Sequence, residues 1–265
     1  MKLLGTRTVE KPWGKPSLPP QFDIPAGKRI GEVWFEPPSE MPDILVKYIF
    51  TSEKLSVQVH PTDEQARRLG EANHGKEECW LVIDAEPGAT LGIGFKEMVS
   101  AEAMRTAACN GSIEDLMQWF KVKRGDFFYI PAGTVHAIGA GVSLVEIQQN
   151  SDITYRLYDY GRPRELHLDS GISVAMGQPY VGGTHYDLSS CSAQRMVDGP
   201  YFKADLVCGQ PDGSLPQTSP RMLIPLNGDI LIGTERVFPG QAALLLEETD
   251  ILAHADALSI IVSMN

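Results

Sequence analysis

Residues 125–138 read GDFFYIPAGTVHAI, and this stretch predicts a tight corner between two β-strands that carries one histidine. Gly125 permits a tight turn into the first strand. Pro131 and Gly133 end that strand in a stiff turn, and His136 begins the next one. The alternative is an ordinary turn with a histidine at the surface. The complete spacing favours a corner that holds the imidazole at a fixed place.

Residues 54–64, KLSVQVHPTDE, contain a strand with a polar side chain at every second position. Ser56, Gln58 and His60 therefore share one face, and the intervening leucine and valines share the other. The apolar face can pack into a core. The polar face fits either a half-exposed strand in water or one wall of a binding site.

Residues 75–84, GKEECWLVID, add two carboxylates, Glu77 and Glu78, at the start of another predicted strand. Period two sends them to opposite faces, so we expect one of them to be a metal ligand, and the pattern does not select which. Two imidazoles, one carboxylate and one amide oxygen suit Zn²⁺ and are compatible with Mn²⁺, Fe²⁺ or Co²⁺. Cys79 is interpreted as a small buried hydrophobe. Four histidines lack such spacing and are interpreted as surface or structural residues: His74, His167, His185 and His254.

The composition is that of an ordinary globular protein. The chain has 265 residues, 43% of them hydrophobic, and a formal net charge of −11. This charge argues against nucleic acid or an anionic membrane as a partner, so an anionic substrate needs a local cluster of cations. The four cysteines form no C-x-x-C pair, and no apolar run suggests a signal or a membrane span. We expect reduced thiols and a cytoplasmic location. The sequence indicates no oligomeric state.

Many short runs of valine, isoleucine, leucine and aromatic residues, separated by glycine and proline, predict an all-β sandwich or barrel. We expect two β units, residues 1–175 with the unusual chemistry and a smaller unit at 176–265. Helices are expected at 61–72, capped by Thr62, at 100–120, as two helices broken at Asn110-Gly111, and at 162–176.

The blocks LSVQVHP, GKEECW, GDFFYIPAGTVHAI and EIQQNSDITYRLYDYGRPRELH follow one another along the chain. In this order they resemble the signature blocks of type I mannose-6-phosphate isomerases in their short bacterial form, a family of the cupin superfamily. EKPWG and GEVWF are similar to its N-terminal blocks, and the resemblance covers about residues 9–170. It implies a mainly β fold of two cupin-type jelly-roll barrels with a few short helices. It also implies a zinc-dependent aldose–ketose isomerase that interconverts mannose 6-phosphate and fructose 6-phosphate through an enediol.

The resemblance also assigns roles to residues of this chain. It selects Glu78 over Glu77 and implies four metal ligands: Gln58, His60, Glu78 and His136. The active-site arginine falls on Arg156, and Glu146 and Asp152 are both candidates for proton transfer, without a ranking. Substrate contacts are implied for Lys47, Ser56 and Lys76, and Lys47, Lys76 and Arg162 could supply the local positive charge.

The chain departs from the family pattern in three places. It has no room for the large helical insertion of the longer enzymes, and the short link between YDYG and RPRELH weakens the match of Arg162. PGQAALLLEETDI, 239–251, looks like a decayed copy of the histidine corner. Leu246, Glu248 and Ile251 stand where proline, glycine and histidine would be, so we expect no metal in the C-terminal barrel and a packing role for it.

Two other classes of function remain open. One is a different metal-dependent cupin enzyme, either an iron oxygenase or another sugar-phosphate isomerase. Oxygen uptake with bound iron would support the oxygenase, whereas Gln58 as an extra ligand and the Lys76/Arg156 pair argue against it. The other is a non-catalytic sugar-binding cupin, against which the complete ligand set argues.

Overall fold

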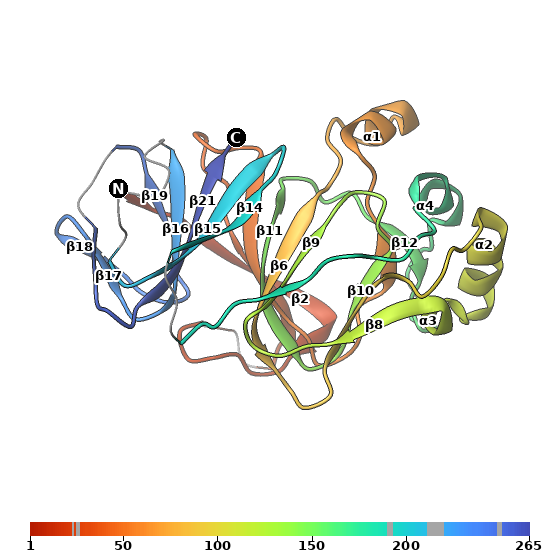
Figure 1. The fold of residues 1–265 in the computed structure, drawn as a ribbon, viewed down its shortest axis with the longest axis horizontal. Helices are drawn as coiled ribbons and strands as arrows, with labels where there is room; N and C mark the ends of the chain where they lie inside the picture. The colour runs from red at the N-terminus through yellow and green to blue at the C-terminus, as the bar shows by residue number, and fades with distance from the viewer. Residues whose placement is uncertain (23, 25–26, 190–192, 211–219, 248–250) are drawn as a thin grey trace.

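Short antiparallel strands dominate the computed structural model of this chain, and they form two β units that lie side by side (Figure 1). The structure describes residues 1–265 apart from 23, 25–26, 190–192, 211–219 and 248–250. The expected mainly β, cupin-like fold is confirmed.

The first unit is a sandwich of two sheets. The seven-stranded sheet contains, in spatial order, β13 (Thr184–His185), β9 (Asp126–Ile130), β6 (Glu78–Ala85), β11 (Val142–Gln149), β4 (Ile44–Phe50), β3 (Ile30–Phe35) and β2 (Thr6–Lys15). The five-stranded sheet contains β12 (Tyr155–Tyr158), β5 (Val57–Val59), β10 (His136–Ile138), β7 (Thr90–Phe95) and β8 (Met117–Lys121).

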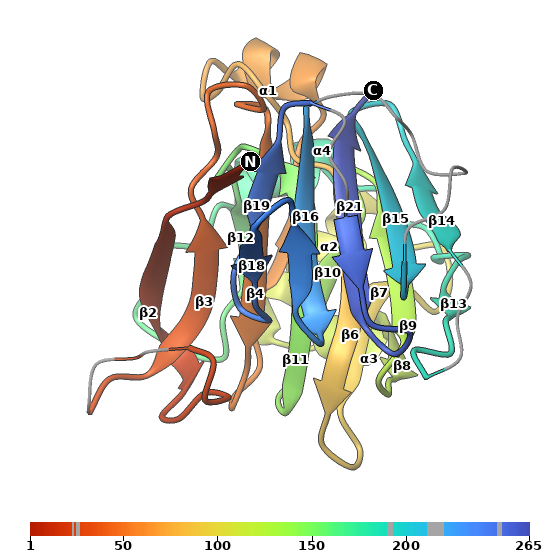
Figure 2. The same cartoon turned by 90° about the vertical axis from the view of Figure 1, so that its left-hand side faces the viewer.

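The second unit also has two sheets. Its six-stranded sheet contains, in order, β1 (Lys2–Leu3), β19 (Ala243–Leu245), β16 (Arg221–Asn227), β21 (Leu258–Met264), β15 (Phe202–Cys208) and β14 (Gln194–Asp198). A three-stranded sheet contains β18 (Glu235–Val237), β17 (Ile230–Ile232) and β20 (Ile251–Ala253). Figure 2 shows the larger of these sheets facing the viewer.

Two short strands cross the predicted division at residue 175. Strand β1, from the start of the chain, pairs with β19 in the second unit. Strand β13, which follows residue 175, pairs with β9 in the first unit. The division itself stays a prediction, and these exchanged strands tie the two units together.

The seven-stranded sheet is the middle layer of the molecule, and its central strands β4 and β11 are buried on both faces. One face of β4, β6 and β11 carries Tyr48, Leu81 and Val145, which share a hydrophobic core with Leu206 and Ile260 of the second unit. The side chains at the alternate positions of the same strands point toward the five-stranded sheet. This inner face is where the charged residues of β4, β6 and β11 lie, so strand alternation separates packing from chemistry.

Each of the three predicted helical segments contains helix, although the helices are shorter than the predicted segments. Helix α1 (Asp63–Leu69) begins with a capping box, in which Thr62 accepts from the Gln65 N–H, and it ends at Gly70 with φ 71°. Helices α2 (Ala101–Asn110) and α3 (Ile113–Leu116) are separated at the predicted break. Helix α4 (Leu168–Val174) lies inside the third predicted segment.

One helix prediction is wrong in part. The helix expected to run to residue 120 ends at Leu116, and Met117–Lys121 forms β8 instead. This segment pairs with β7, where Leu91 lies opposite Phe120 and Gly92 lies opposite Trp119. Trp119 and Phe120 therefore lie in an edge strand of the five-stranded sheet. The pairing of this strand with β7 overrides the local helical pattern of the sequence.

The cysteines only partly match the expectation. Cys79 is buried with a free thiol, as predicted, and Cys109 is also free. Cys208 is disulfide-bonded, so the expectation of reduced thiols is wrong for this residue. Cys191 lies outside the described residues. Within the described ranges, no helix is long and apolar enough to cross a membrane.

Candidate active site

Three neighbouring strands of the seven-stranded sheet form one wall of the site. Glu146 of β11 lies between Lys47 of β4 and Trp80 of β6 in the ladder. Two residues further along, Gln148 lies opposite Glu78. The period-two alternation of these strands thus brings acidic and basic side chains to one interior face.

The five-stranded sheet forms the opposite wall. Gln58 lies on β5, between His136 of β10 and Arg156 of β12 in the ladder. His60 follows the end of β5, and its carbonyl accepts a hydrogen bond from the N–H of Gly133 in the predicted corner. This bond connects the two histidine-bearing segments, which are far apart in sequence.

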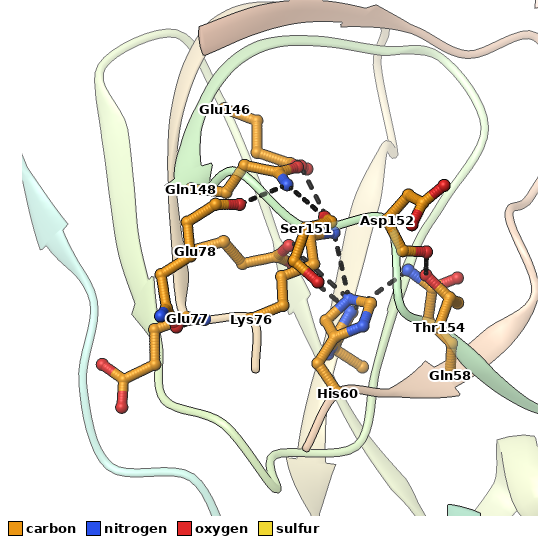
Figure 3. A network of polar contacts seen from close by, with 12 residues as sticks. Gln58, His60, Lys76, Glu77, Glu78, Glu146, Gln148, Ser151, Asp152 and Thr154 are labelled. Atoms are coloured by element: carbon orange, nitrogen blue, oxygen red, sulfur yellow. Dashed lines mark hydrogen bonds and ion pairs between the residues drawn. The ribbon is translucent and has the colours of Figure 1, made fainter. Parts of the chain in front are cut away.

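Three residues from the two walls meet at one point, and Figure 3 shows two of them, His60 and Glu78. Glu78 Oε2 lies 3.5 Å from His60 Nε2, and Glu78 Oε1 lies 3.4 Å from His136 Nε2. One ligand atom from each of the three residues lies within 4.8 Å of the others, and each residue is at most 2% exposed. The Gln58 amide nitrogen is 3.3 Å from His136 Nε2, so this side chain reaches the same point.

Both imidazoles are oriented by main-chain carbonyls. His60 Nδ1 is 2.8 Å from the carbonyl oxygen of Ile153, and His136 Nδ1 is 2.8 Å from that of Thr134. Because a carbonyl only accepts, each Nδ1 carries the hydrogen and each Nε2 keeps its lone pair toward Glu78. Burial lowers the pKa of both histidines, and the nearby Lys76 ammonium lowers that of His60 further. The rings are therefore neutral, as metal binding requires.

The residues present fit a tetrahedral metal ion. Ligand atoms about 2.05 Å from a tetrahedral Zn²⁺ lie about 3.3 Å from one another, close to the two Glu78–histidine distances. Glu78 Oε1 is buried without a hydrogen-bond donor among the described residues. Ser56 Oγ lies 3.2 Å from the Gln58 amide oxygen and can also accept from the amide, so a turn of that amide would present its oxygen to the ion.

Two lysines and Glu146 continue the polar interior beyond Glu78. Lys76 Nζ lies 2.6 Å from Glu78 Oε2 and 3.6 Å from Glu146 Oε1. Lys47 Nζ lies 2.9 Å from the same Glu146 oxygen, and Trp80 Nε1 donates to the other. Burial alone would raise the pKa of Glu146, but the two ammonium groups outweigh it and lower that pKa to about 2.

A clasp of two polar side chains, Asp63 and Gln149, holds the segments that carry these residues. Asp63 Oδ1 accepts from the Gly75 N–H at 2.7 Å and from Gln149 Nε2 at 3.0 Å. Gln149 Oε1 in turn accepts from the Glu77 N–H at 2.9 Å. Glu77 points away from the histidines and accepts from the Tyr129 hydroxyl. The structure therefore brings Glu78, and not Glu77, to the two imidazoles.

The site opens into a cavity of about 650 Å³. The sequence-predicted residues that line it are Lys47, Ser56, Gln58, Lys76, Glu146, Asp152 and Arg156. Among described residues Arg164 lines the cavity in place of Arg162, whose guanidinium binds Asp159 and the Lys54 carbonyl. The expectation that Arg162 supplies charge there is thus not met.

The sequence interpretation missed several lining residues: Arg7, Lys11, Gln148, Arg164 and His167. His167 was interpreted as surface or structural, yet it lines the cavity, and its Nδ1 accepts from the Arg156 N–H. Arg7 and Lys11 lie four apart on β2, so strand periodicity alone could have placed them on one face.

Comparisons with known proteins agree with this geometry. No family model matches the sequence. The chain is 37% identical over 207 residues to mannose-6-phosphate isomerase ManA of Bacillus subtilis, across 75% of this chain and 64% of that protein. It is 36% identical over 219 residues to mannose-6-phosphate isomerase of Streptococcus mutans, across 79% and 67%.

The chain belongs to the mannose-6-phosphate isomerase family. The aligned region spans about two thirds of the length of these curated relatives. In structure, the chain is similar to the crystal structure of the mannose 6-phosphate isomerase from Bacillus subtilis, with a TM-score of 0.81 over 98% of each chain at 24% identity. That similarity supports the same fold.

Proposed function

We propose that this protein is a zinc-dependent isomerase that interconverts mannose 6-phosphate and fructose 6-phosphate through an enediol. The observation that carries the proposal is the meeting of two neutral imidazoles with the Glu78 carboxylate behind Gln58 and Lys76, which line a cavity with further cationic side chains in its wall. The names of the curated relatives support the substrate pair. A reaction on a phosphorylated sugar is consistent with a cytoplasmic location, which remains a prediction.

His60, Glu78 and His136 would hold the metal, with Gln58 as the fourth ligand. The metal supplies a Lewis acid that polarises the sugar oxygens and stabilises negative charge on them. A solved structure of the same fold is described as a zinc-bound holo mannose 6-phosphate isomerase, at 14% identity and a TM-score of 0.71. This likeness and the nitrogen and oxygen donor set favour zinc over the other candidate ions.

The reaction moves a proton between C1 and C2, and the interior supplies the charges that this transfer needs. Glu146 is held anionic between Lys47 and Lys76 with a pKa of about 2, which makes it a weak base. We therefore assign Glu146 to fixing the two lysines, which can face the developing enediolate oxygens. Asp152, exposed in the cavity wall, is then the carboxylate for proton transfer.

The phosphate group would bind at Arg156 and Arg164. Both guanidinium groups line the cavity, and the charge of Arg164, after burial, lowers the pKa of Arg156, so the two lie close together. Asp159 holds Arg164 through two bonds of 2.6 Å. Such paired and preorganised arginines suit a phosphate dianion, and they offset the negative net charge of the chain locally.

A turnover assay combined with metal analysis tests this proposal. Zinc-loaded protein should convert mannose 6-phosphate to fructose 6-phosphate and back, with one zinc ion per chain. Oxygen uptake by iron-loaded protein, in the absence of isomerisation, would favour the oxygenase class. If zinc binds stoichiometrically and the two sugar phosphates do not interconvert, the proposed reaction is wrong.

A further inference from the structure

Gln148 occupies a position on the inner face of β11 to which the proposed mechanism gives no role. It is 1% exposed and lines the cavity. It lies two residues from Glu146, on the same face of the strand, and opposite Glu78 in the ladder. A neutral amide therefore lies beside two acids, Glu78 and Glu146, on the inner face of the sheet (Figure 3).

The orientation of this amide is fixed by its neighbours. Gln148 Nε2 donates to the carbonyl oxygens of Gln149 and Ser151, each at 2.8 Å. Because both partners only accept, the nitrogen has to occupy this side of the amide. Turning the side chain over would lose both bonds and set oxygen against oxygen.

The amide oxygen has no such partner. Gln148 Oε1 is buried and meets no hydrogen-bond donor among the described residues. The two buried lysines of the same interior pair with carboxylates, Lys47 with Glu146 and Lys76 with Glu78. A buried acceptor without a donor is unfavourable and rare in folded proteins, so this oxygen calls for a donor supplied from outside the protein.

We propose that Gln148 Oε1 accepts a hydrogen bond from a hydroxyl group of the bound sugar and is a specificity-determining residue. This inference rests on the proposed function and extends it. Phosphate and ketone oxygens have no hydrogen to donate, and the neighbouring cations attract them. The fixed acceptor therefore distinguishes a sugar that has a hydroxyl at one ring or chain position from one that lacks it.

Three variants separate the acceptor from the donor of this amide. Gln148→Lys keeps donors for the two carbonyls and removes the acceptor. Gln148→Glu keeps acceptors and removes the donors, and Gln148→Met removes both. Each variant and the wild type are assayed with mannose 6-phosphate and with its monodeoxy analogues at C3 and C4, whose missing hydroxyl takes no part in the proton transfer, with folding and zinc content measured in parallel.

For one analogue, the wild type should lose about 10- to 100-fold in kcat/KM relative to mannose 6-phosphate, the size of a lost buried hydrogen bond. The Lys and Met variants should lose a similar factor on mannose 6-phosphate and show no further loss with that analogue. The Glu variant should keep the discrimination, and all three should bind one zinc ion.

The opposite pattern overturns the inference. If Glu and Met variants lose activity while the Lys variant keeps both its activity and its discrimination, the amide serves only to hold the loop through Nε2. If no analogue distinguishes the wild type from the variants, no hydroxyl is bound here. A wild type that does not isomerise mannose 6-phosphate overturns the proposed function, and this inference with it.

Discussion

The two β units share an architecture but differ in the side chains that their strands point into the interior. The interior of the first unit holds Lys47, Glu78 and Glu146 in addition to apolar side chains. The core within the second unit is mainly aliphatic, with residues such as Leu223 and Ile232, and its buried charged residues are Asp205 and Arg221. The fold alone therefore does not provide the chemistry. The chemistry depends on which side chains stand at the inward-facing positions of a few strands.

The two corners show the same contrast at the level of single residues. His136 is buried beside Glu78, whereas Ile251, at the matching position of the second corner, packs in the aliphatic core. Glu248 lies outside the described residues. Among the described residues, the one group of histidine, cysteine and acidic side chains that could hold a metal lies in the first unit. The absence of a metal from the second unit stays a prediction.

The largest expected effect comes from the carboxylate that faces the histidines. Glu78→Gln removes the anionic ligand, so we expect loss of bound zinc and a fall in isomerase activity of at least about 1,000-fold. Glu77→Gln is the matched control, because Glu77 directly precedes the same strand, points away from the histidines and contacts Tyr129. It should keep one zinc ion and activity within about threefold. Equal losses in the two variants, measured by metal analysis and turnover, would contradict the separation of faces.

The sequence could predict the parts of the site that lie close together along the chain. The corner at 125–138 and the alternation around Gln58 and His60 follow from local rules of turns and strands. The choice between Glu77 and Glu78 required the family resemblance, because alternation places one on each face without saying which face is inside. The structure decides it through the contact between Glu78 and the two imidazoles.

The missed residues depend on contacts between distant segments. Arg164 replaces Arg162 at the cavity because Asp159 pairs with both and directs them differently, which sequence spacing does not reveal. The partnerless oxygen of Gln148 becomes visible only when the carbonyls of Gln149 and Ser151 are placed. Met117–Lys121 was misassigned because pairing with β7 decides its conformation.

A second prediction concerns the buried charges of the first unit. The folded-state pKa of Glu146 is about 2, below its ordinary value of 4.5. This lowered pKa stabilises the fold above about pH 4.5, and the contribution is lost as the pH falls toward 2. Lys47→Met removes a positive charge beside the buried carboxylates of Glu146 and Glu32, so we expect the free energy of unfolding to fall by about 3–5 kcal/mol at pH 7. The difference from the wild type should be smaller at pH 3.5, where protonation can neutralise a carboxylate that has lost its partner. Activity should fall about 10- to 100-fold.

Urea unfolding followed by tryptophan fluorescence measures this effect in the first unit, because all four tryptophans lie there: Trp13, Trp34, Trp80 and Trp119. Lys203→Met in the second unit is the control, since Lys203 is partly exposed and lies 3.8 Å from Asp198. It should change stability by less than about 1 kcal/mol at either pH. If the loss of stability in Lys47→Met grows as the pH falls, the charge of Glu146 is not its cause.

A third prediction concerns the clasp outside the site. Asp63→Asn replaces the carboxylate that accepts from both Gly75 and Gln149 with a neutral and weaker acceptor, so we expect zinc affinity to fall about tenfold through loosening of the segment that carries Glu78. Zinc affinity is measured by competition with a chelator. Asp169→Asn, at an exposed position on α4, is the control. Unchanged affinity in Asp63→Asn would show that the strand holds Glu78 without the clasp.

The smallest effect on activity is expected in the second unit, and it tests whether that unit serves only for packing. Leu223→Ala truncates a fully buried side chain of its core, so we expect about 2–5 kcal/mol of destabilisation with zinc affinity and kcat/KM unchanged at 25 °C.

Leu144→Ala is the matched variant in the first unit, since Leu144 is equally buried and lies two residues from Glu146 on the same face. It should destabilise by a similar amount and also lower kcat/KM, because the cavity it leaves adjoins the strand that holds Glu146. Thermal unfolding and kinetics of both variants compare the two units directly. If Leu223→Ala lowers kcat/KM as much as Leu144→Ala does, the second unit controls the geometry of the site through the core that the two units share.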